Sequence, residues 1–366
     1  MKGSVALMPP AVDLPATGAV LERGLGVVFT AASLQVRAAG QVICRRALGD
    51  HAPAGSKVSP ASIFDLASLT KLFVVTALLA LFDRRAFALD DPIITVMPEF
   101  AGPDVRRATV SFRSLLTHTS GLPAHVNFRE ESSYEAVMAR VCATPLAHAP
   151  GETIVYSDLG FMLAGETVVR LSGLSLPAAI EQFVGQPLSL ASLGYRPPAW
   201  LRDRIVATED DPRRGGLLRG DVHDENCWAM GGIAGHAGLF GTADDVAALG
   251  EMYRLGGAYG PGRQLLRPTA LAAIRENARS ADERRGLGWA LKCGDAQSSG
   301  SRLSPDSFGH TGYTGTSIWV DPTRALTIVL LTNRVHLTRD PDPIRLVRAA
   351  VADSVVDELD SLLPHG

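Results

Sequence analysis

The most apolar part of the chain lies at 64–82. Residues 66–82 read LASLTKLFVVTALLALF, so a helix formed here would carry apolar side chains on almost every face. Such a helix is buried in a protein core rather than laid on its surface. The longest nearly apolar run in it, Leu72–Phe82, has 11 residues and is too short to cross a bilayer. We therefore expect a buried central helix and no membrane span.

Strand patterns gather at the two ends of the chain. Short β-branched and apolar runs broken by glycines predict a strand pair over 24–50. The same pattern returns at 286–291, 309–322 and 326–333, and a closing helix is expected over Pro343–Leu363. One sheet assembled from both ends of the chain would explain this arrangement.

The segment between about 90 and 280 is predicted to be mainly helical. Helix-start signals occur at Asp91-Pro92, Ser111 and Thr242-Ala-Asp-Asp245, and 156–171 carries apolar residues at helical spacing. The expected fold class is α+β, an antiparallel sheet flanked by helices with a mostly helical second domain. The predicted boundaries place 1–72 with 283–366 in the sheet domain and 73–282 in the helical domain.

Composition narrows the functional classes. The 366 residues include 46% apolar and 20% charged side chains, as in an ordinary globular protein. Thirty-five basic against 38 acidic residues give a net charge of −3, which excludes a strongly basic nucleic-acid binder. The four cysteines form no C-x-x-C pair, so a thiol–disulfide motif or a cysteine-type zinc site has no support.

The N-terminal sequence, MKGSVALMPPAVDLPATG, starts with a basic residue but does not build a secretory apolar segment. Three prolines and Asp13 interrupt it. The expected location is therefore cytoplasmic, with a periplasmic location as the alternative if a leader has been removed.

Candidate chemistry begins in the apolar helix, with Ser68-Leu-Thr-Lys71. Residues three apart share a helix face, so the Lys71 ammonium can reach the Ser68 hydroxyl. A serine becomes a nucleophile when a neighbouring base takes its proton, and the helix N-terminus favours a developing negative charge. S-x-x-K alone is a common sequence, and chance is the simpler explanation for it.

Two distant segments favour the catalytic interpretation over chance: Tyr156-Ser-Asp158 and His310-Thr311-Gly312. With Ser68-x-x-Lys71 they resemble, in order and separation, the motif set of the serine β-lactamase and penicillin-binding-protein family. The resemblance is closest to the class C β-lactamase branch with its related serine esterases and DD-peptidases, where the motifs are S-x-x-K, Y-x-N and K-T-G or H-T-G. The segments 115–123 (LLTHTSGLP) and 234–245 (AGHAGLFGTADD) also look like this family.

The resemblance implies a role for each motif residue. Ser68 resembles the acylated nucleophile, Lys71 its proton partner, and Tyr156 the phenol that moves the serine proton to the leaving group. His310 is expected beside Tyr156 on the edge strand. The backbone N–H groups of Ser68 and Tyr313 are expected to form the oxyanion hole. Thr311 and Gly312 are expected to bind substrate, because glycine lets a substrate backbone approach the strand closely.

Two positions depart from the family pattern. Asp158 stands where an asparagine is common, and an ionised carboxylate cannot donate a hydrogen bond to a substrate carbonyl. His310 replaces a lysine that commonly holds the substrate carboxylate, and histidine is mostly neutral above about pH 7. Both changes argue against an efficient β-lactamase and leave the acyl-transfer residues in place.

The segment 219–232, RGDVHDENCWAMGG, is the most unusual stretch outside the motifs. His223 and Asn226 are candidates for binding a polar substrate from a loop at the cleft. The alternatives are a loop whose polar groups cap one another, and a metal site completed by His236. No H-x-x-x-H or H-E-x-x-H accompanies the segment, so no metal site is expected. VHDEN, YSDLGF and LLTNRVH further resemble members associated with muropeptides, including a muramoyl-alanine amidase.

A histidine–serine pair and an arginine outside the motifs also have side chains suited to a site. His118 and Ser120, in THTSG, are two residues apart on an expected turn and are assigned to satisfying loop and helix-end backbone groups. Arg339, which with His336 follows the last strand, is a candidate for holding a substrate carboxylate with its two-pronged guanidinium. An ordinary solvated arginine is the alternative.

The sequence therefore predicts a serine hydrolase that works through an acyl-enzyme without metal or organic cofactor. Its substrate would be a small molecule or peptide: first cell-wall peptides or muropeptides, then small carboxylic esters, then β-lactams. The alternatives are a weak β-lactamase or DD-carboxypeptidase, a catalytically silent peptide- or muropeptide-binding protein, and a zinc amidase. The oligomeric state stays open, as does the choice between Lys71 and Tyr156 as general base, because such coupled groups share their titration.

Overall fold

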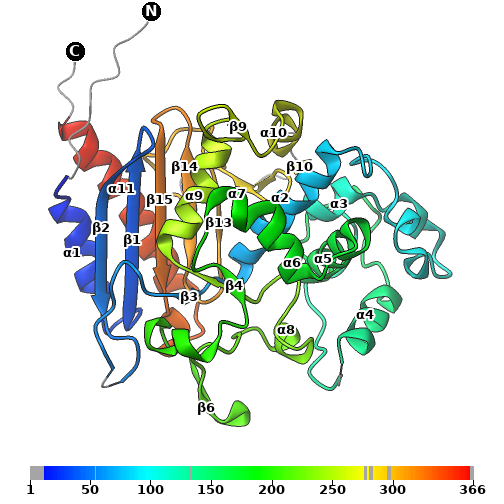
Figure 1. The fold of residues 1–366 in the computed structure, drawn as a ribbon, viewed down its shortest axis with the longest axis horizontal. Helices are drawn as coiled ribbons and strands as arrows, with labels where there is room; N and C mark the ends of the chain where they lie inside the picture. Colours follow the sequence, from blue (N-terminus) through cyan, green and yellow to red (C-terminus); the bar gives the residue numbers. More distant parts are fainter. Residues whose placement is uncertain are drawn as a thin grey trace, which may run out of the picture.

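An eight-stranded antiparallel sheet organises the molecule (Figure 1). The computed structural model describes residues 12–53, 55–131, 133–275, 278–279, 283–294 and 298–362. The strand order is β10-β11-β12-β13-β14-β15-β1-β2. The bounds are β1 Ala31–Ala38, β2 Gln41–Gly49, β10 Ala278–Arg279, β11 Arg284–Arg285, β12 Ala290–Leu291, β13 Phe308–Thr311, β14 Ser317–Asp321 and β15 Leu326–Thr332.

Strands from the two ends of the chain pair with each other in this sheet. Strand β15 pairs with β1 in antiparallel register, with Val36 opposite Ile328. Most strand positions here are buried on both faces, as expected for a sheet covered by helices on each side. The α+β class and the joining of N-terminal and C-terminal strands are therefore confirmed.

Helices cover both faces of the sheet. On one face α1 (Pro15–Gly24) lies beside α11 (Asp342–Leu362), where the Glu358 carboxylate accepts hydrogen bonds from the N–H groups of Ala16 and Thr17. On the other face α9 (Ala243–Arg254) packs against β1, β14 and β15. The apolar helix α2 (Thr70–Asp83) is enclosed on that side, and 12 of its residues are buried.

The rest of the described chain forms short helices, loops and small sheets. The remaining α-helices are α3 Phe112–Leu116, α4 Tyr134–Ala143, α5 Asp158–Ser172, α6 Leu176–Ile180, α7 Gln186–Leu188, α8 Glu225–Ala229 and α10 Pro268–Arg275. The small strands are β3 Phe64–Asp65, β4 Gly194–Tyr195, β5 Asp210–Asp211, β6 Gly216–Leu217, β7 Leu239–Gly241, β8 Ala258–Gly260 and β9 Arg263–Gln264. The 73–282 segment is thus mainly helix and loop, while the exact domain boundaries stay a prediction.

Three expectations about local structure need correction. The helix expected over 66–82 starts later, at Thr70, because Phe64–Asp65 pairs with β7 and Ala67–Leu69 forms a 3-10 turn. Asp91-Pro92 opens only the 3-10 turn Ile93–Thr95. The strand expected over 309–322 is a hairpin, since the chain turns between β13 and β14. The signals at Ser111 and Thr242 are confirmed, because both side chains cap their helices in capping boxes.

Within the described ranges, no single helix is long and apolar enough to cross a membrane. By length and composition alone, only the pair Asp158–Ser172 and Leu176–Leu188 qualifies, and the two are bent by 77°.

Candidate active site

Ser68 lies on a tight turn in front of α2. The Asp65 carboxylate accepts hydrogen bonds from the N–H of Ala67 (2.8 Å) and the N–H of His223 (2.7 Å). Ala67 has φ +47°, a left-handed conformation that is strained for a residue with a Cβ. Asp65 therefore supports the strained residue next to Ser68 and ties this turn to the 219–232 loop.

Lys71 is completely buried, with a relative exposure of 0%. Its ammonium donates to the Ser68 hydroxyl (3.0 Å), the Asp158 carboxylate (2.8 Å) and the His236 carbonyl (3.1 Å), which uses its three N–H groups. Burial alone would lower the pKa of Lys71, but the charge of Asp158 and the nearby Tyr156 outweigh it and raise the pKa above its usual value. Lys71 is therefore an ammonium at neutral pH.

Tyr156 stands over Lys71, with 4.9 Å between the Nζ atom and the ring centroid. Its ring lies between His118 (centroids 4.5 Å apart) and His310 (5.9 Å). The Nδ1 atom of His118 accepts the N–H of Ser157, whose hydroxyl caps α5. The expected role of His118 at a helix end is thus confirmed, and the same contacts fix the start of α5 beside Tyr156.

His310 is the last residue but one of β13 and faces Tyr156 as a neutral ring. Burial lowers its pKa well below the usual value, and the charges of Arg285 and Lys71 lower it further. Its Nδ1 lies 2.8 Å from the Thr311 carbonyl, so Nδ1 carries the proton and donates it there. The Nε2 lone pair is buried without a partner in the described structure.

The β13–β14 turn is attached directly to the Ser68 turn. The Thr314 hydroxyl donates to the Asp65 carbonyl (2.9 Å) and the Thr316 hydroxyl to the Leu66 carbonyl (3.1 Å). A Cβ on Gly312 would overlap the Thr316 hydroxyl and crowd Leu66. The lack of a Cβ at Gly312 therefore lets the β13–β14 turn pack closely against the Ser68 turn. This reason for a glycine differs from the substrate contact that was expected at this position.

Two backbone amides at this junction have no acceptor in the described part of the chain: Ser68 N–H and Tyr313 N–H. They come from two segments that the two threonine hydrogen bonds hold together. Free N–H groups on a rigid junction next to a serine hydroxyl are what a tetrahedral oxyanion requires.

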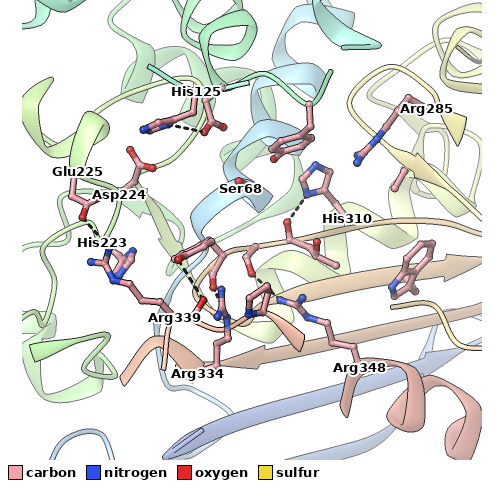
Figure 2. A pocket seen from close by; sticks show the side chains of 18 residues that line it. Ser68, His125, His223, Asp224, Glu225, Arg285, His310, Arg334, Arg339 and Arg348 are labelled. Atoms are coloured by element: carbon pink, nitrogen blue, oxygen red, sulfur yellow. Dashed lines mark hydrogen bonds and ion pairs between the residues drawn. The ribbon is translucent and has the colours of Figure 1, made fainter. Parts of the chain in front are cut away.

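The site opens into a cavity of about 560 Å³, shown in Figure 2. It brings together nine of the residues expected from the sequence, while Lys71 lies buried beneath Ser68. The lining residues are Ser68, His125, Tyr156, Asp158, His223, Asp224, Glu225, Arg285, Ala290, His310, Thr311, Gly312, Tyr313, Trp319, Arg334, Arg339, Pro341 and Arg348.

Asn226 does not line this cavity. Its side chain is buried, accepts from the Phe128 N–H (2.9 Å) and donates to the Val126 carbonyl (2.8 Å). These bonds use the amide to hold the 126–128 loop, so the expected substrate contact has no support in the geometry.

Arg339 and His223 line the cavity, but both are occupied. Arg339 donates to both oxygens of Glu209 (2.8 and 2.7 Å) and to Glu225 (3.1 Å). His223 lies 2.7 Å from the same Glu209, and its ring stacks on Tyr313 with centroids 5.7 Å apart. The charge expected from Arg339 for a substrate carboxylate is thus neutralised within the protein.

The sequence reasoning did not identify several charged residues of the cavity. Arg285 lies with its guanidinium 5.1 Å from the Tyr156 ring centroid. Arg334 and Arg348 line the cavity and donate to carbonyls of the β13–β14 turn, and His125 lies 3.9 Å from Asp158. None of these belongs to a motif or periodic pattern, so only the folded chain brings them to the site.

A metal site in the 219–232 loop was the alternative for that segment. Its Asp224 carboxylate instead contacts the His236 ring (2.8 Å) and caps α8 through the Cys227 N–H (2.7 Å). Within the described ranges, no group of three or more His, Cys, Asp or Glu side chains is placed to hold a metal ion.

Known proteins resemble this chain in sequence and in fold. The Beta-lactamase family profile matches residues 22–352. A "Putative D-alanyl-D-alanine carboxypeptidase" of Escherichia coli (strain K12) is 32% identical over 310 residues, covering 76% of this chain and 71% of the relative.

Two solved structures show the shared fold. A class C beta lactamase from Rhodobacter sphaeroides has a TM-score of 0.75 at 20% identity, covering 94% of this chain and 99% of its own. A family VIII carboxylesterase has a TM-score of 0.74 at 20% identity, with coverages of 92% and 95%.

The family match spans most of the chain and includes all three motif segments. Inside it, a serine hydroxyl, a buried ammonium and a phenol ring meet at one cavity. The chain therefore belongs to the Beta-lactamase family and is a serine hydrolase of esters or amides.

Proposed function

We propose that Ser68 is the nucleophile of this hydrolase and that its natural substrates are peptides or muropeptides derived from the bacterial cell wall. Small carboxylic esters rank second and β-lactams third. The observation that carries the proposal is the contact of the Lys71 ammonium with the Ser68 hydroxyl (3.0 Å) directly beneath the Tyr156 ring (4.9 Å to its centroid).

In the proposed reaction Tyr156 acts as a phenolate beside the Lys71 ammonium. The Ser68 oxygen attacks the substrate carbonyl carbon, and its proton passes to the phenolate oxygen. Lys71 is not assigned as the base, because its raised pKa keeps it protonated in the free enzyme. It stabilises negative charge that passes between Ser68 and Tyr156. The N–H groups of Ser68 and Tyr313 hold the oxyanion.

Collapse of the tetrahedral intermediate breaks the amide or ester bond. The leaving amine or alkoxide takes its proton from Tyr156, and the acyl group stays on Ser68. Water then attacks the acyl-enzyme and gives a proton to Tyr156, which returns it to Ser68 as the acid leaves.

Charge in the cavity supports a peptide with a free terminal carboxylate. His310 is neutral, so it cannot replace a lysine as the carboxylate's partner. Arg285, beside Tyr156 and His310, supplies a positive charge instead. The E. coli relative is named as a D-alanyl-D-alanine carboxypeptidase, whose substrate class carries such a carboxylate.

The carboxylate of Asp158 and the expected location of the protein bear on the choice of substrate. The Asp158 carboxylate is used by Lys71 and offers no amide N–H to an acylamino side chain, which argues against rapid β-lactam turnover. The cytoplasmic location expected from the N-terminal residues fits soluble wall fragments as substrates, and it stays a prediction.

The test is intact-mass analysis after incubation with a D-alanyl-D-alanine peptide, a short-chain ester and a penicillin. We expect an acyl adduct on the Ser68 peptide and release of D-alanine, both absent in Ser68→Ala. Ser301→Ala, at an exposed serine held by Asp353, is the matched control and should behave as wild type. Hydrolysis that survives Ser68→Ala would overturn the proposal, and peptide binding without adduct or turnover would point to a silent binding protein.

A further inference from the structure

Two buried arginines line the cavity beside the β13–β14 turn. Arg334, in the 3-10 turn Arg334–His336 after β15, is 2% exposed, and Arg348 of α11 is 8% exposed. Both line the cavity, and in Figure 2 their guanidinium groups lie below Ser68 and His310.

Their polar contacts are all to uncharged carbonyls. Arg348 donates to the carbonyls of Gly312 (2.7 Å) and Thr316 (2.8 Å). Arg334 donates to the carbonyls of Tyr313 (2.8 Å) and Thr338 (3.4 Å), and its guanidinium lies 4.5 Å from the Tyr313 ring centroid. These contacts hold the β13–β14 turn but give neither guanidinium an ion-pair partner; Asp340 attracts Arg334 without pairing with it.

Their lack of a charge partner distinguishes them from Arg339 next to them, which contacts two glutamates. Buried Arg107 and Lys292 also donate only to carbonyls, but neither lines the cavity. In the described chain, no carboxylate pairs with Arg334 or Arg348, and the buried Nε of Arg348 has no hydrogen-bond partner. An uncompensated buried charge costs several kcal/mol, at about the scale of breaking a buried ion pair.

Electrostatics agrees with this geometry. Burial lowers the pKa of Arg348 to about 9, and the positive charge of Arg334 adds to the effect. Two like charges are thus held near each other against their own repulsion, in a wall of the active-site cavity. An anion in the cavity would relieve both the repulsion and the cost of burial.

We propose that Arg334 and Arg348 form a second anion subsite, which binds a carboxylate on the leaving group of the substrate. This rests on the proposed function, in which Arg285 meets the first carboxylate. In Figure 2, Arg285 and Arg348 lie on the His310 side of Ser68, while Asp224 and Glu225 lie on the other. The preferred leaving group is therefore dicarboxylic, such as an acidic D-amino acid.

Three aryl esters of N-acetylglycine test this, with phenol, 3-hydroxybenzoate and 5-hydroxyisophthalate as leaving groups. Each kcat/KM is divided by the rate constant for hydroxide hydrolysis, which removes differences in intrinsic reactivity. A charge-assisted contact gives a gain of about tenfold or more. We expect that gain from neutral to monocarboxylate, and again from monocarboxylate to dicarboxylate.

Arg334→Gln and Arg348→Gln are the test variants, and Arg302→Gln, at an arginine 58% exposed, is the matched control. Because both test residues also hold the turn, damage to the turn slows all three esters alike and leaves the ratios unchanged. Loss of the subsite instead brings the dicarboxylate-to-monocarboxylate ratio close to one.

The outcomes separate the two proposals. A dicarboxylate-to-monocarboxylate ratio near one in wild type would overturn the second subsite. A raised ratio that both variants retain would overturn it as well. Absence of the first gain, with hydrolysis still dependent on Ser68, would count against the carboxylate-terminated substrate instead. Calorimetric binding of 5-hydroxyisophthalate against 3-hydroxybenzoate gives the same comparison without turnover: equal affinities would overturn the subsite.

Discussion

The Asp158 carboxylate lies 2.8 Å from the ammonium of Lys71, inside the wall of the cavity. Burial would raise the pKa of Asp158, but the charge of Lys71 outweighs it and lowers the pKa below its usual value. The pair is therefore ionised at neutral pH. An asparagine, common at this position in related enzymes, would give Lys71 no such charge partner.

Asp158→Asn removes this partner and keeps the side-chain shape. Burial then acts on Lys71 against a weaker opposing charge, so its pKa falls. If protonated Lys71 is the working form, the alkaline limb of the pH profile of kcat/KM lies above pH 10 in the wild type, because the pKa of Lys71 is raised, and moves to lower pH in the variant. The measurement is ester hydrolysis between pH 5 and 10, where we expect a Lys71-dependent alkaline limb in the variant and none in the wild type.

The matched control is Asp50→Asn, which breaks the exposed pair with Lys57 and should leave the profile unchanged. The variant's new amide N–H should also lower KM for acylamino substrates. An alkaline limb at the wild-type position in Asp158→Asn would rule out charge support of Lys71 as the role of Asp158.

Tyr156→Phe removes the phenol hydroxyl and keeps the ring between His118 and His310. Loss of a positioned acid–base group reduces kcat/KM by about 10²–10⁴-fold, with adduct formation on Ser68 slowed equally. Stopped-flow ester hydrolysis with mass analysis of the adduct measures both. Tyr134→Phe, which loses a bond of 2.7 Å to Glu166, is the control: it should cost about 1 kcal/mol in stability and keep the kinetics. Wild-type rates in Tyr156→Phe would remove Tyr156 from the mechanism.

Helices with local signals were predictable from the sequence. The Thr242 capping box starts α9, and the closing helix expected over 343–363 is α11, within a residue at each end. The start of the central helix was not predictable, because Phe64 and Asp65 pair with β7, a segment about 175 residues away in sequence. Pairing with so distant a strand leaves no trace in local periodicity.

The residues of the candidate site also divide into those that the sequence predicts and those that it does not. Ser68, Lys71, Tyr156 and His310 carry motif signals, and the fold brings them together. Arg285, Arg334 and Arg348 carry none, since an arginine in a strand or helix looks like a solvated surface residue until its neighbours are known. Asn226 was expected to bind substrate because its polar sequence neighbours suggested a binding loop. In the structure its amide instead holds backbone groups of the 126–128 loop.

Arg285 and Arg339 should differ in what their loss affects. Arg285→Gln removes the charge beside Tyr156, so KM for a carboxylate-terminated peptide should rise about tenfold or more, with little change for a neutral ester. Arg339→Gln leaves Glu209 and Glu225 without their shared partner, so it should lower the melting temperature instead. Steady-state kinetics and thermal unfolding of both variants measure this. A KM effect confined to Arg339→Gln would restore Arg339 as the carboxylate partner.

Stability should fall as the pH drops below about 6.5, the usual histidine pKa. Burial lowers the pKa of His118 and of His310, with the charges of Arg285 and Lys71 adding to it. Both rings thus stay neutral in the folded state while they take up protons when unfolded. Each such ring reduces the free energy of unfolding by up to about 1.4 kcal/mol per pH unit.

Denaturant unfolding between pH 7.5 and 5 measures this slope. Glu209, whose burial is outweighed by Arg339 and His223, has its pKa lowered to about 2 and so does not titrate in this window. Burial raises the pKa of Asp65 and of Asp245, and these carboxyls act on the slope with the opposite sign. His118→Asn keeps an acceptor for the Ser157 N–H and tolerates the φ of +60°, so the slope should fall by about half. His125 is 57% exposed, and Asp158 raises its pKa, so its protonation stabilises the folded state as the pH falls. His125→Asn should therefore steepen the slope slightly or leave it unchanged. A wild-type slope in His118→Asn would mean that His118 takes up its proton equally well in the folded and unfolded states.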